Sequence, residues 1–250
     1  MKQERMKKKE MERIKRAIII AAGEGRRLRP VTVSTPKPLV KVHGVSFVDT
    51  IIGALKANGI HEIYIVTGYK KEQFYKLYRE DPDIIILENP DYQTANNIMS
   101  LYVAKDYLPG SFIIEGDLMI KNPAIFSPQI PGSGYAASYM QDVPEWALTV
   151  RDGRICGCHV KGGKNCYRLW GVSMWSSSDG ELLAEYVKRQ VEEIGDTSIF
   201  WDEIALFREP EAFDLGIREV GLNDIYEIDT FEELIHVDHS YENYRENEGE

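Results

Sequence analysis

The stretch AIIIAAGEGRRLRP, residues 17–30, joins a run of β-branched apolar residues directly to a loop with two glycines and three arginines. The apolar run predicts a buried strand over residues 17–22 that leads into this loop. In an open α/β sheet, ligands bind beyond the carboxyl ends of the strands. Gly23 and Gly25 allow the backbone to approach an anion there, and the arginines supply positive charge. The loop is therefore predicted to bind an anionic ligand.

The segments that follow alternate between strand and helix patterns. Runs rich in Ile and Val predict strands, and apolar residues at helical spacing predict helices. The predicted order is helix 48–59, strand 61–69, helix 71–80, strand 83–89, helix 96–108 and strand 111–117. Strict alternation of this kind is typical of a mostly parallel sheet that is covered by helices on both faces.

Beyond residue 120 the pattern changes to short strand-like segments. Asp152-Gly153 lies at the centre of WALTVRDGRICGCHV, which predicts a β-hairpin. Residues 179–195 form an amphipathic helix pattern with Asp179 as the expected cap, and a last helix is expected to open near Thr230. We therefore predict an α/β, three-layer, Rossmann-like fold with a mixed, mostly parallel central sheet and a small antiparallel subregion.

The distribution of charge divides the chain into three parts. The net charge is −10, yet residues 1–16 carry eight Lys and Arg against three Glu. We interpret residues 1–16 as a basic, solvated helical extension, 17–238 as one domain and 239–250 as an acidic tail. An acidic body of this kind repels nucleic acid over most of its surface, so a polynucleotide partner is not expected.

Membrane insertion and a disulfide framework are not expected either. The sequence has neither an apolar run of the length that a membrane span needs nor a signal-peptide core at its start. The three cysteines suit a reducing compartment, and the predicted location is cytoplasmic.

The anion can be named from a longer pattern. The glycines alone do not define it, because the loop has neither the third glycine of a dinucleotide fingerprint nor the GK[ST] of a P-loop. However, AAGEGRRLRPVTVSTPKPL resembles the opening signature of the nucleotidyltransferases that make nucleotide-diphosphate sugars and alcohols, A-A-G-x-G-x-R-L-x-P followed by P-K-P-L. The resemblance implies a nucleoside triphosphate as ligand and pyrophosphate as leaving group. It implies that Ala22, Gly23 and Gly25 contact the nucleotide and that Arg27 and Lys37 bind its phosphates, as catalytic residues.

Two aspartates are the candidate metal ligands. Asp117 follows the apolar strand SFIIEG at the carboxyl edge of the predicted sheet, where a Mg²⁺ ligand is expected. Asp229 occupies the position at which the same family carries its second metal-binding aspartate, so the resemblance implies that it shares the ion. Asp202 is a rival for this second position, and Asp229 could instead cap the last helix.

The tryptophans give a prediction about the acceptor, which is the substrate that receives the nucleotidyl group. All four lie between residues 146 and 201, in the half of the chain that is expected to bind the acceptor. A quaternary ammonium has no N–H to donate and is held by aromatic faces and nearby carboxylates. Core packing is the alternative for each tryptophan. The candidate acceptor-binding residues are Glu145, Trp146, Trp175, Trp201, Asp202 and Glu227.

Further motifs narrow the resemblance. GYKKEQF (68–74), NPDYQTANNIMSLY (89–102) and the closing IYEID look like the bacterial choline-phosphate cytidylyltransferases. This implies CTP as nucleotide, phosphocholine as acceptor and Mg²⁺ as cofactor, with Gly68, Asn97 and Ser100 among the base and ribose contacts. Phosphoethanolamine, 2-aminoethylphosphonate and a sugar 1-phosphate remain alternative acceptors. A nucleotide-sensing module without turnover and a homodimer also stay open.

Overall fold

The structure, a computed structural model, describes residues 11–244, and a mixed sheet forms its centre. Within these residues the sheet has nine strands in the order β10-β14-β12-β11-β13-β7-β2-β5-β6. Its parallel half consists of β7 (Ser111–Glu115), β2 (Arg16–Ala21), β5 (Glu62–Thr67) and β6 (Ile84–Glu88). The predicted α/β fold with a mixed sheet is confirmed, and β2 is the strand that the opening apolar run predicts.

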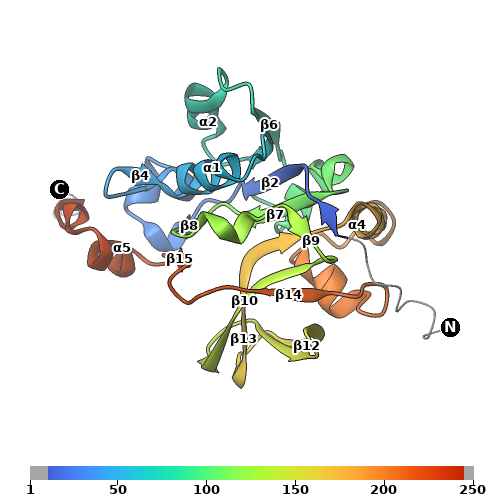
Figure 1. Cartoon of the computed structure of the whole chain (residues 1–250). Helices are drawn as coiled ribbons and strands as arrows, with labels where there is room; N and C mark the ends of the chain where they lie inside the picture. Colours follow the sequence, from blue (N-terminus) through green and yellow to red (C-terminus); the bar gives the residue numbers. More distant parts are fainter. Residues whose placement is uncertain (1–10, 245–250) are drawn as a thin grey trace.

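The remaining strands of the sheet build the mainly antiparallel half. β13 (Gly163–Met174) pairs antiparallel with β7 and with β10 (Gly134–Val143), and β10 pairs parallel with β14 (Gly216–Glu219). Figure 1 shows β10 and β13 running away from the parallel strands. β11 (Ala147–Arg151) and β12 (Arg154–His159) form the predicted hairpin. Asp152 and Gly153 both have positive φ, as a tight hairpin turn requires.

Helices cover both faces of the parallel strands, which gives three layers. Alternate residues of β2 point to opposite sides, so that Ile19 packs in one cluster with α1 (Phe47–Ala57) and α2 (Lys71–Tyr78), while Ile18 packs in the other with α3 (Ile98–Val103) and α4 (Ser177–Arg189). Every second β-branched side chain is therefore buried on each face, which is why AIII forms a central strand.

Shorter elements complete the described chain. α5 is Phe231–Val237, and the small strands are β1 (Glu12–Arg13), β3 (Lys41–Val42), β4 (Val45–Ser46), β8 (Leu118–Ile120), β9 (Gln129–Ile130) and β15 (Ile225–Glu227). Single-turn helices occupy Arg26–Leu28, Val31–Val33, Lys37–Leu39, Lys105–Tyr107, Pro123–Phe126, Gln190–Ile194, Ile204–Arg208 and His239–Tyr244. In residues 11–244, none of the helices combines the length and the apolar character that crossing a membrane requires.

Helix caps show where local prediction succeeded and failed. Thr230 caps α5 and forms a capping box with Glu233, as expected from the sequence. The expectation for α4 was wrong, because the helix begins before Asp179 and its cap is Ser176, whose hydroxyl accepts from the Asp179 N–H. The Asp179 carboxylate instead accepts a hydrogen bond of 2.6 Å from Ser133. The hydroxyl of the residue directly before the helix fits the cap geometry better than a residue of its first turn.

The described parts of both chain ends pack against the rest of the domain. In residues 11–16, β1 pairs with β9, and Ile14 is buried in the core beside β2, so this part packs as strand and not as helix. At the other end, Tyr241 donates a hydrogen bond to the carbonyl of Lys41. Residues 1–10 and 245–250, the rest of the predicted extension and tail, lie outside the described residues.

Candidate active site

The loop after β2 is held in one shape by its own hydrogen bonds. Gly25 has φ 60° and ψ 43°, in the left-handed region, and its carbonyl accepts a bond of 2.9 Å from the Thr32 hydroxyl. A Cβ at Gly25 would lie 2.6 Å from the Cβ of Lys37. Glycine is therefore needed twice here, for the backbone conformation and for the close approach of the lysine.

Lys37 is buried where the loop returns to the end of the sheet. It lies between Pro36 and Pro38 in a single helical turn, and its Nζ donates hydrogen bonds of 2.8 Å to both Asp117 and Asp229. Burial alone would lower the pKa of Lys37, but the two carboxylates outweigh it and raise the pKa above its ordinary value. The lysine is therefore a fixed positive charge.

Three carboxylates meet beside this lysine. Asp117 follows β7, and Glu227 ends β15, which pairs antiparallel with β8 so that Glu227 lies opposite Leu118. This pairing brings the chain before α5 back to the end of β7. One carboxylate oxygen from each of Asp117, Glu227 and Asp229 lies within 4.8 Å of the others. We call these three residues the acid cluster.

The acid cluster fits a divalent metal ion. Carboxylate oxygens are the ligands that Mg²⁺ prefers, and three of them converge from separate segments of the chain. In residues 11–244, this is the only group of three or more His, Cys, Asp or Glu with such geometry, and Asp202 is not part of it. Glu227, one of the predicted acceptor-binding residues, is a member of the acid cluster.

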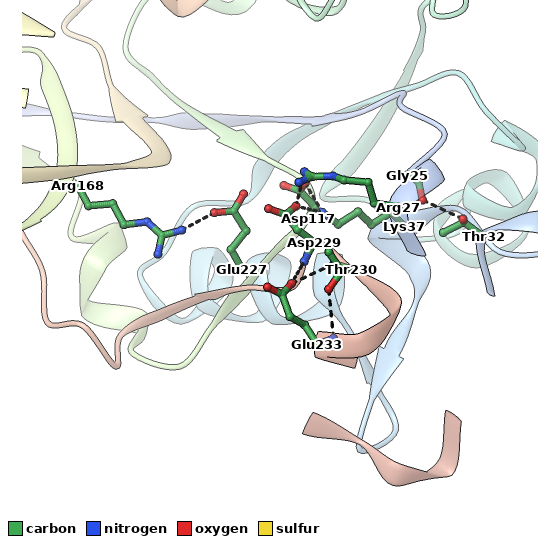
Figure 2. Close-up of polar contacts among 10 residues, drawn as sticks. All are labelled: Gly25, Arg27, Thr32, Lys37, Asp117, Arg168, Glu227, Asp229, Thr230 and Glu233. Atoms are coloured by element: carbon green, nitrogen blue, oxygen red, sulfur yellow. Dashed lines mark hydrogen bonds and ion pairs between the residues drawn. The ribbon is translucent and has the colours of Figure 1, made fainter. Parts of the chain in front are cut away.

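Cations flank the acid cluster on two sides (Figure 2). Arg27 Nη2 lies 2.8 Å from Asp229 Oδ1, next to Lys37. On the other side, Arg168 Nη2 donates to Glu227 Oε2 over 2.7 Å. Burial, followed by the charges of Asp117 and Asp229, raises the pKa of Glu227 to about 7, while Arg168 opposes this rise. Three cations thus contact the three carboxylates of the acid cluster.

A cavity of about 290 Å³ opens from the acid cluster along the ends of β2 and β7. Seven of the eight predicted nucleotide contacts line it: Ala22, Gly23, Gly25, Arg27, Lys37, Asn97 and Ser100. Gly68 does not line it. A Cβ at Gly68 would lie 2.7 Å from the ring of Tyr92, which does line the cavity, so Gly68 allows that ring to pack closely.

Asn89 and Glu115 are among the cavity residues that the sequence did not single out. Asn89 is buried and donates a bond of 3.0 Å to Ser100 Oγ. Glu115 Oε1 accepts from Asn97 Nδ2 and from Trp201 Nε1, at 3.1 and 3.2 Å. Burial, then the charge of Asp117, raises the pKa of Glu115 well above its ordinary value. Both residues stand at the carboxyl end of a predicted strand, and this position is a signal that could have found them.

The predicted acceptor residues are spread over different environments. Trp175 has no exposed surface, and its ring packs against Tyr135, Trp201 and Phe213 while its Nε1 donates to Ser173. Trp201 is 3% exposed. In this structure, Trp175 is therefore a core residue without an accessible ring face, and the expected cage of Trp146, Trp175 and Trp201 is not open.

Trp146 is different, because it is only half-buried. Its ring meets the exposed rings of Phe200 and Phe207 edge to face, at centroid distances of 5.9 and 5.6 Å. Glu145 beside it is exposed. Burial raises the pKa of Asp202 to about 7. Phe200 precedes Trp201 directly in the segment FWDEI, whereas Phe207 lies outside the motifs that the sequence offers.

Comparisons with known proteins find relatives that match most of the chain. A family model described as nucleotidyl transferase matches residues 16–126. The 2-aminoethylphosphonate cytidylyltransferase of Lancefieldella rimae is 38% identical over 228 residues, which cover 90% of this chain and 92% of that protein. The choline-phosphate cytidylyltransferase of Streptococcus pneumoniae is 34% identical over 220 residues, or 87% of this chain and 94% of that protein.

A solved structure agrees over a similar length. The CTP:phosphocholine cytidylyltransferase from Streptococcus pneumoniae superimposes with a TM-score of 0.83 and 31% identity, covering 92% of this chain and 99% of that chain. The family model includes the loop after β2, Lys37 and Asp117, and the relatives extend the match through most of the rest of the chain. The predicted resemblance is confirmed: the chain belongs to the nucleotidyl transferase family and groups with its cytidylyltransferases.

Proposed function

We propose that this enzyme transfers the cytidylyl group of CTP to 2-aminoethylphosphonate and releases pyrophosphate. The observation that carries the proposal is the pairing of two cations, Lys37 and Arg27, with the acid cluster at one end of a nucleotide-sized cavity. Cations and acids in this arrangement suit a triphosphate together with a divalent ion. The relative of 38% identity, which is named for this acceptor, supports the choice of acceptor.

Two acids, Glu115 and Asp202, support a primary ammonium as the head group of the acceptor. Glu115 and Asp202 are acids for which the residues 11–244 offer no ion-pair partner, and Glu115 is bonded by neutral donors. A primary ammonium can donate hydrogen bonds to such carboxylates, whereas a quaternary ammonium depends on open aromatic faces. Because the ring of Trp175 has no accessible face, we propose 2-aminoethylphosphonate as the acceptor in preference to the phosphocholine that the sequence predicted.

Phosphocholine remains the second candidate. The solved structure at 31% identity is an enzyme for that acceptor, and Trp146 with Phe200 and Phe207 offers partly open aromatic surface. Such a surface can hold a quaternary ammonium through cation–π attraction.

In the proposed reaction, an acceptor phosphonate oxygen attacks the α-phosphorus of CTP in line. A new P–O bond forms while the bond to pyrophosphate breaks, and no proton transfer is needed because the acceptor is already anionic. Lys37 and Arg27 neutralise the triphosphate, and Ala22, Gly23 and Gly25 bring backbone N–H groups to it. Asn97 and Ser100 contact the base and ribose.

The acid cluster would hold the metal ion, through Asp117 and Asp229 with Glu227 as a third ligand. Bound there, Mg²⁺ supplies positive charge to the transferring phosphate. Lys37 Nζ contacts the same two aspartates.

Pyrophosphate release tests the proposal. Each of the four nucleoside triphosphates is combined with 2-aminoethylphosphonate, phosphoethanolamine, phosphocholine and glucose 1-phosphate. We expect turnover with CTP and the highest kcat/KM with 2-aminoethylphosphonate. A higher kcat/KM with phosphocholine would favour the second candidate. Turnover with the sugar phosphate alone would overturn both head-group assignments, and CTP binding without turnover would identify a nucleotide-sensing module.

A further inference from the structure

The two groups of cations around the acid cluster lie on opposite sides of it. Lys37 and Arg27 contact Asp229 on one side, and Arg168 contacts Glu227 on the other (Figure 2). Among the described residues, these are the three cations that form ion pairs with the acid cluster. Two of them belong to the loop region that lines the nucleotide cavity, whereas Arg168 comes from β13 and is not among the lining residues.

We propose that Arg168 binds the phosphonate or phosphate group of the acceptor and holds its oxygen toward the α-phosphorus of CTP. This inference rests on the proposed cytidylyl transfer. In-line displacement requires the nucleophile and the leaving group on opposite sides of the reacting phosphorus. We assign the triphosphate to the side of the acid cluster where Lys37 and Arg27 lie. The phosphonate or phosphate group of the acceptor approaches from the opposite side and needs a separate cation there.

Arg168 is held in place before any ligand arrives. Its guanidinium carbon lies 4.1 Å from the centre of the Trp170 ring, a stacked cation–π arrangement. Trp170 is itself fixed, because its Nε1 donates over 2.9 Å to Ser138 Oγ, which donates over 2.7 Å to the carbonyl of Val220. Both Trp170 and Ser138 are buried. The tryptophan therefore acts as a rigid support for the arginine.

Arg168 also retains donors for a ligand. Its side chain is 23% exposed, and Nη2 makes the one hydrogen bond that the guanidinium forms to described residues. A guanidinium has five N–H donors in a planar fork, which matches two oxygens of a phosphonate or phosphate. A lysine ammonium would lack both the fork and the stacking on Trp170. The residue type therefore fits a tetrahedral anion better than it fits a carboxylate partner alone.

The proposed contact predicts that replacing Arg168 weakens binding of the phosphonate or phosphate group of the acceptor. In Arg168→Lys and Arg168→Ala, we expect the KM of the acceptor to rise about 10- to 100-fold, as for a charged hydrogen bond. The Kd of CTP, measured by calorimetry with Mg²⁺, should stay within about twofold of the wild type. Acceptors with primary and quaternary ammonium groups should lose affinity equally. Added guanidinium ion should restore part of the activity of Arg168→Ala.

Calorimetry separates this inference from the proposed function. The acceptor is titrated into enzyme loaded with a non-cleavable CTP analogue and Mg²⁺, for the wild type, for Arg168→Lys and for Arg154→Gln. Arg154 is the first residue of β12 and pairs with Asp214 at 3.5 Å. The Arg154→Gln variant serves as a matched control that should bind as the wild type does.

Two results distinguish the possible failures. Unchanged acceptor affinity in Arg168→Lys, with weaker CTP or Mg²⁺ binding instead, would mean that Arg168 only serves Glu227 and would overturn the inference. If the wild type prefers a sugar 1-phosphate, the head-group assignment fails, and the same Arg168 comparison is made with that acceptor. Arg168→Lys keeps the charge, so it decides the matter even if Arg168→Ala does not fold.

Discussion

The Nζ atom of Lys37 lies 2.8 Å from the Oδ1 atom of Asp229, a residue 192 positions further along the chain. The same Oδ1 atom lies 2.8 Å from Arg27 Nη2. One carboxylate oxygen thus contacts both cations that we assign to the triphosphate. Nucleotide binding must therefore redistribute these contacts, and Lys37 links the metal ligands to the phosphate site.

Replacing Lys37 should lower both the turnover of the enzyme and its melting temperature without Mg²⁺. We expect Lys37→Met to lower kcat by about 100- to 1000-fold, because it removes a preorganised charge from the transition state. Without Mg²⁺ its melting temperature should fall, since Asp117 and Asp229 lose their counter-charge, and added Mg²⁺ should raise it by more than in the wild type. Lys41→Met, at an exposed lysine, is the control. Unchanged turnover would remove Lys37 from the mechanism.

The second metal ligand can be decided between Asp229 and Asp202. Asp229 shares the acid cluster with Asp117, whereas Asp202 does not belong to it. Asp229→Asn should abolish most of the rise in melting temperature that Mg²⁺ causes, and Asp202→Asn should preserve it. Differential scanning fluorimetry across Mg²⁺ concentrations gives this comparison. The opposite pattern would make Asp202 the ligand.

The glycine at position 25 should not tolerate a side chain. Gly25→Ala places a methyl group 2.6 Å from Lys37 Cβ at a backbone φ of 60°. We expect a loss of about 1 to 3 kcal/mol in the free energy of unfolding, together with a lower kcat because Lys37 must shift. Gly53→Ala is the matched control, since nothing lies within 4 Å of a Cβ there and the residue is inside α1. Urea denaturation measures both, and equal stabilities would contradict the steric argument.

The free energy of unfolding should depend on pH through the carboxyl group of Asp202. Burial raises its pKa from 3.8 to about 7 in the folded chain. Between these pH values the folded state holds a proton that the unfolded state has released, so the free energy of unfolding falls as the pH rises through this window. Asp202→Asn removes this dependence on pH. The free energy of unfolding of Asp202→Asn should therefore exceed that of the wild type by an amount that grows from about pH 4 to pH 7, with an upper limit of roughly 4 kcal/mol. Asp106→Asn, at an exposed aspartate, should show a flat difference.

The tryptophans should divide into a structural and a binding group. Trp175→Ala should cost about 3 to 5 kcal/mol of stability, because it empties a fully buried site. The milder Trp175→Phe should leave the acceptor KM nearly unchanged. In contrast, Trp146→Ala should raise the KM of phosphocholine more than that of 2-aminoethylphosphonate, since a quaternary ammonium relies on aromatic faces. A large effect of Trp175→Phe on KM would return Trp175 to the acceptor site.

Much of the fold follows from signals that act over a few residues. The β-branched run at 17–22 and the alternation of strands and helices predicted the parallel half of the sheet. Asp152-Gly153 predicted its hairpin, and Thr230 predicted the start of α5. Turn conformations and capping hydrogen bonds involve neighbouring residues only, and therefore the sequence reveals them directly.

The site was predicted as far as single segments could show it. Lys37 and Asp117 were identifiable because each lies in a motif or at the end of a strand. The position of Glu227 in the acid cluster was not identifiable from the sequence, because it depends on the pairing of β15 with β8. This pairing joins segments about 100 residues apart. The burial of Trp175 likewise arises from packing between segments far apart in the chain.

By itself, the sequence determined the local elements, the anion-binding loop and the residue types of the chemistry. Only the tertiary structure decided which acids converge, which cation faces the far side of the acid cluster and which tryptophans stay accessible. The reason is physical: hydrogen bonds and side-chain periodicity are set by neighbours in the chain, whereas burial and ion pairing are set by neighbours in space.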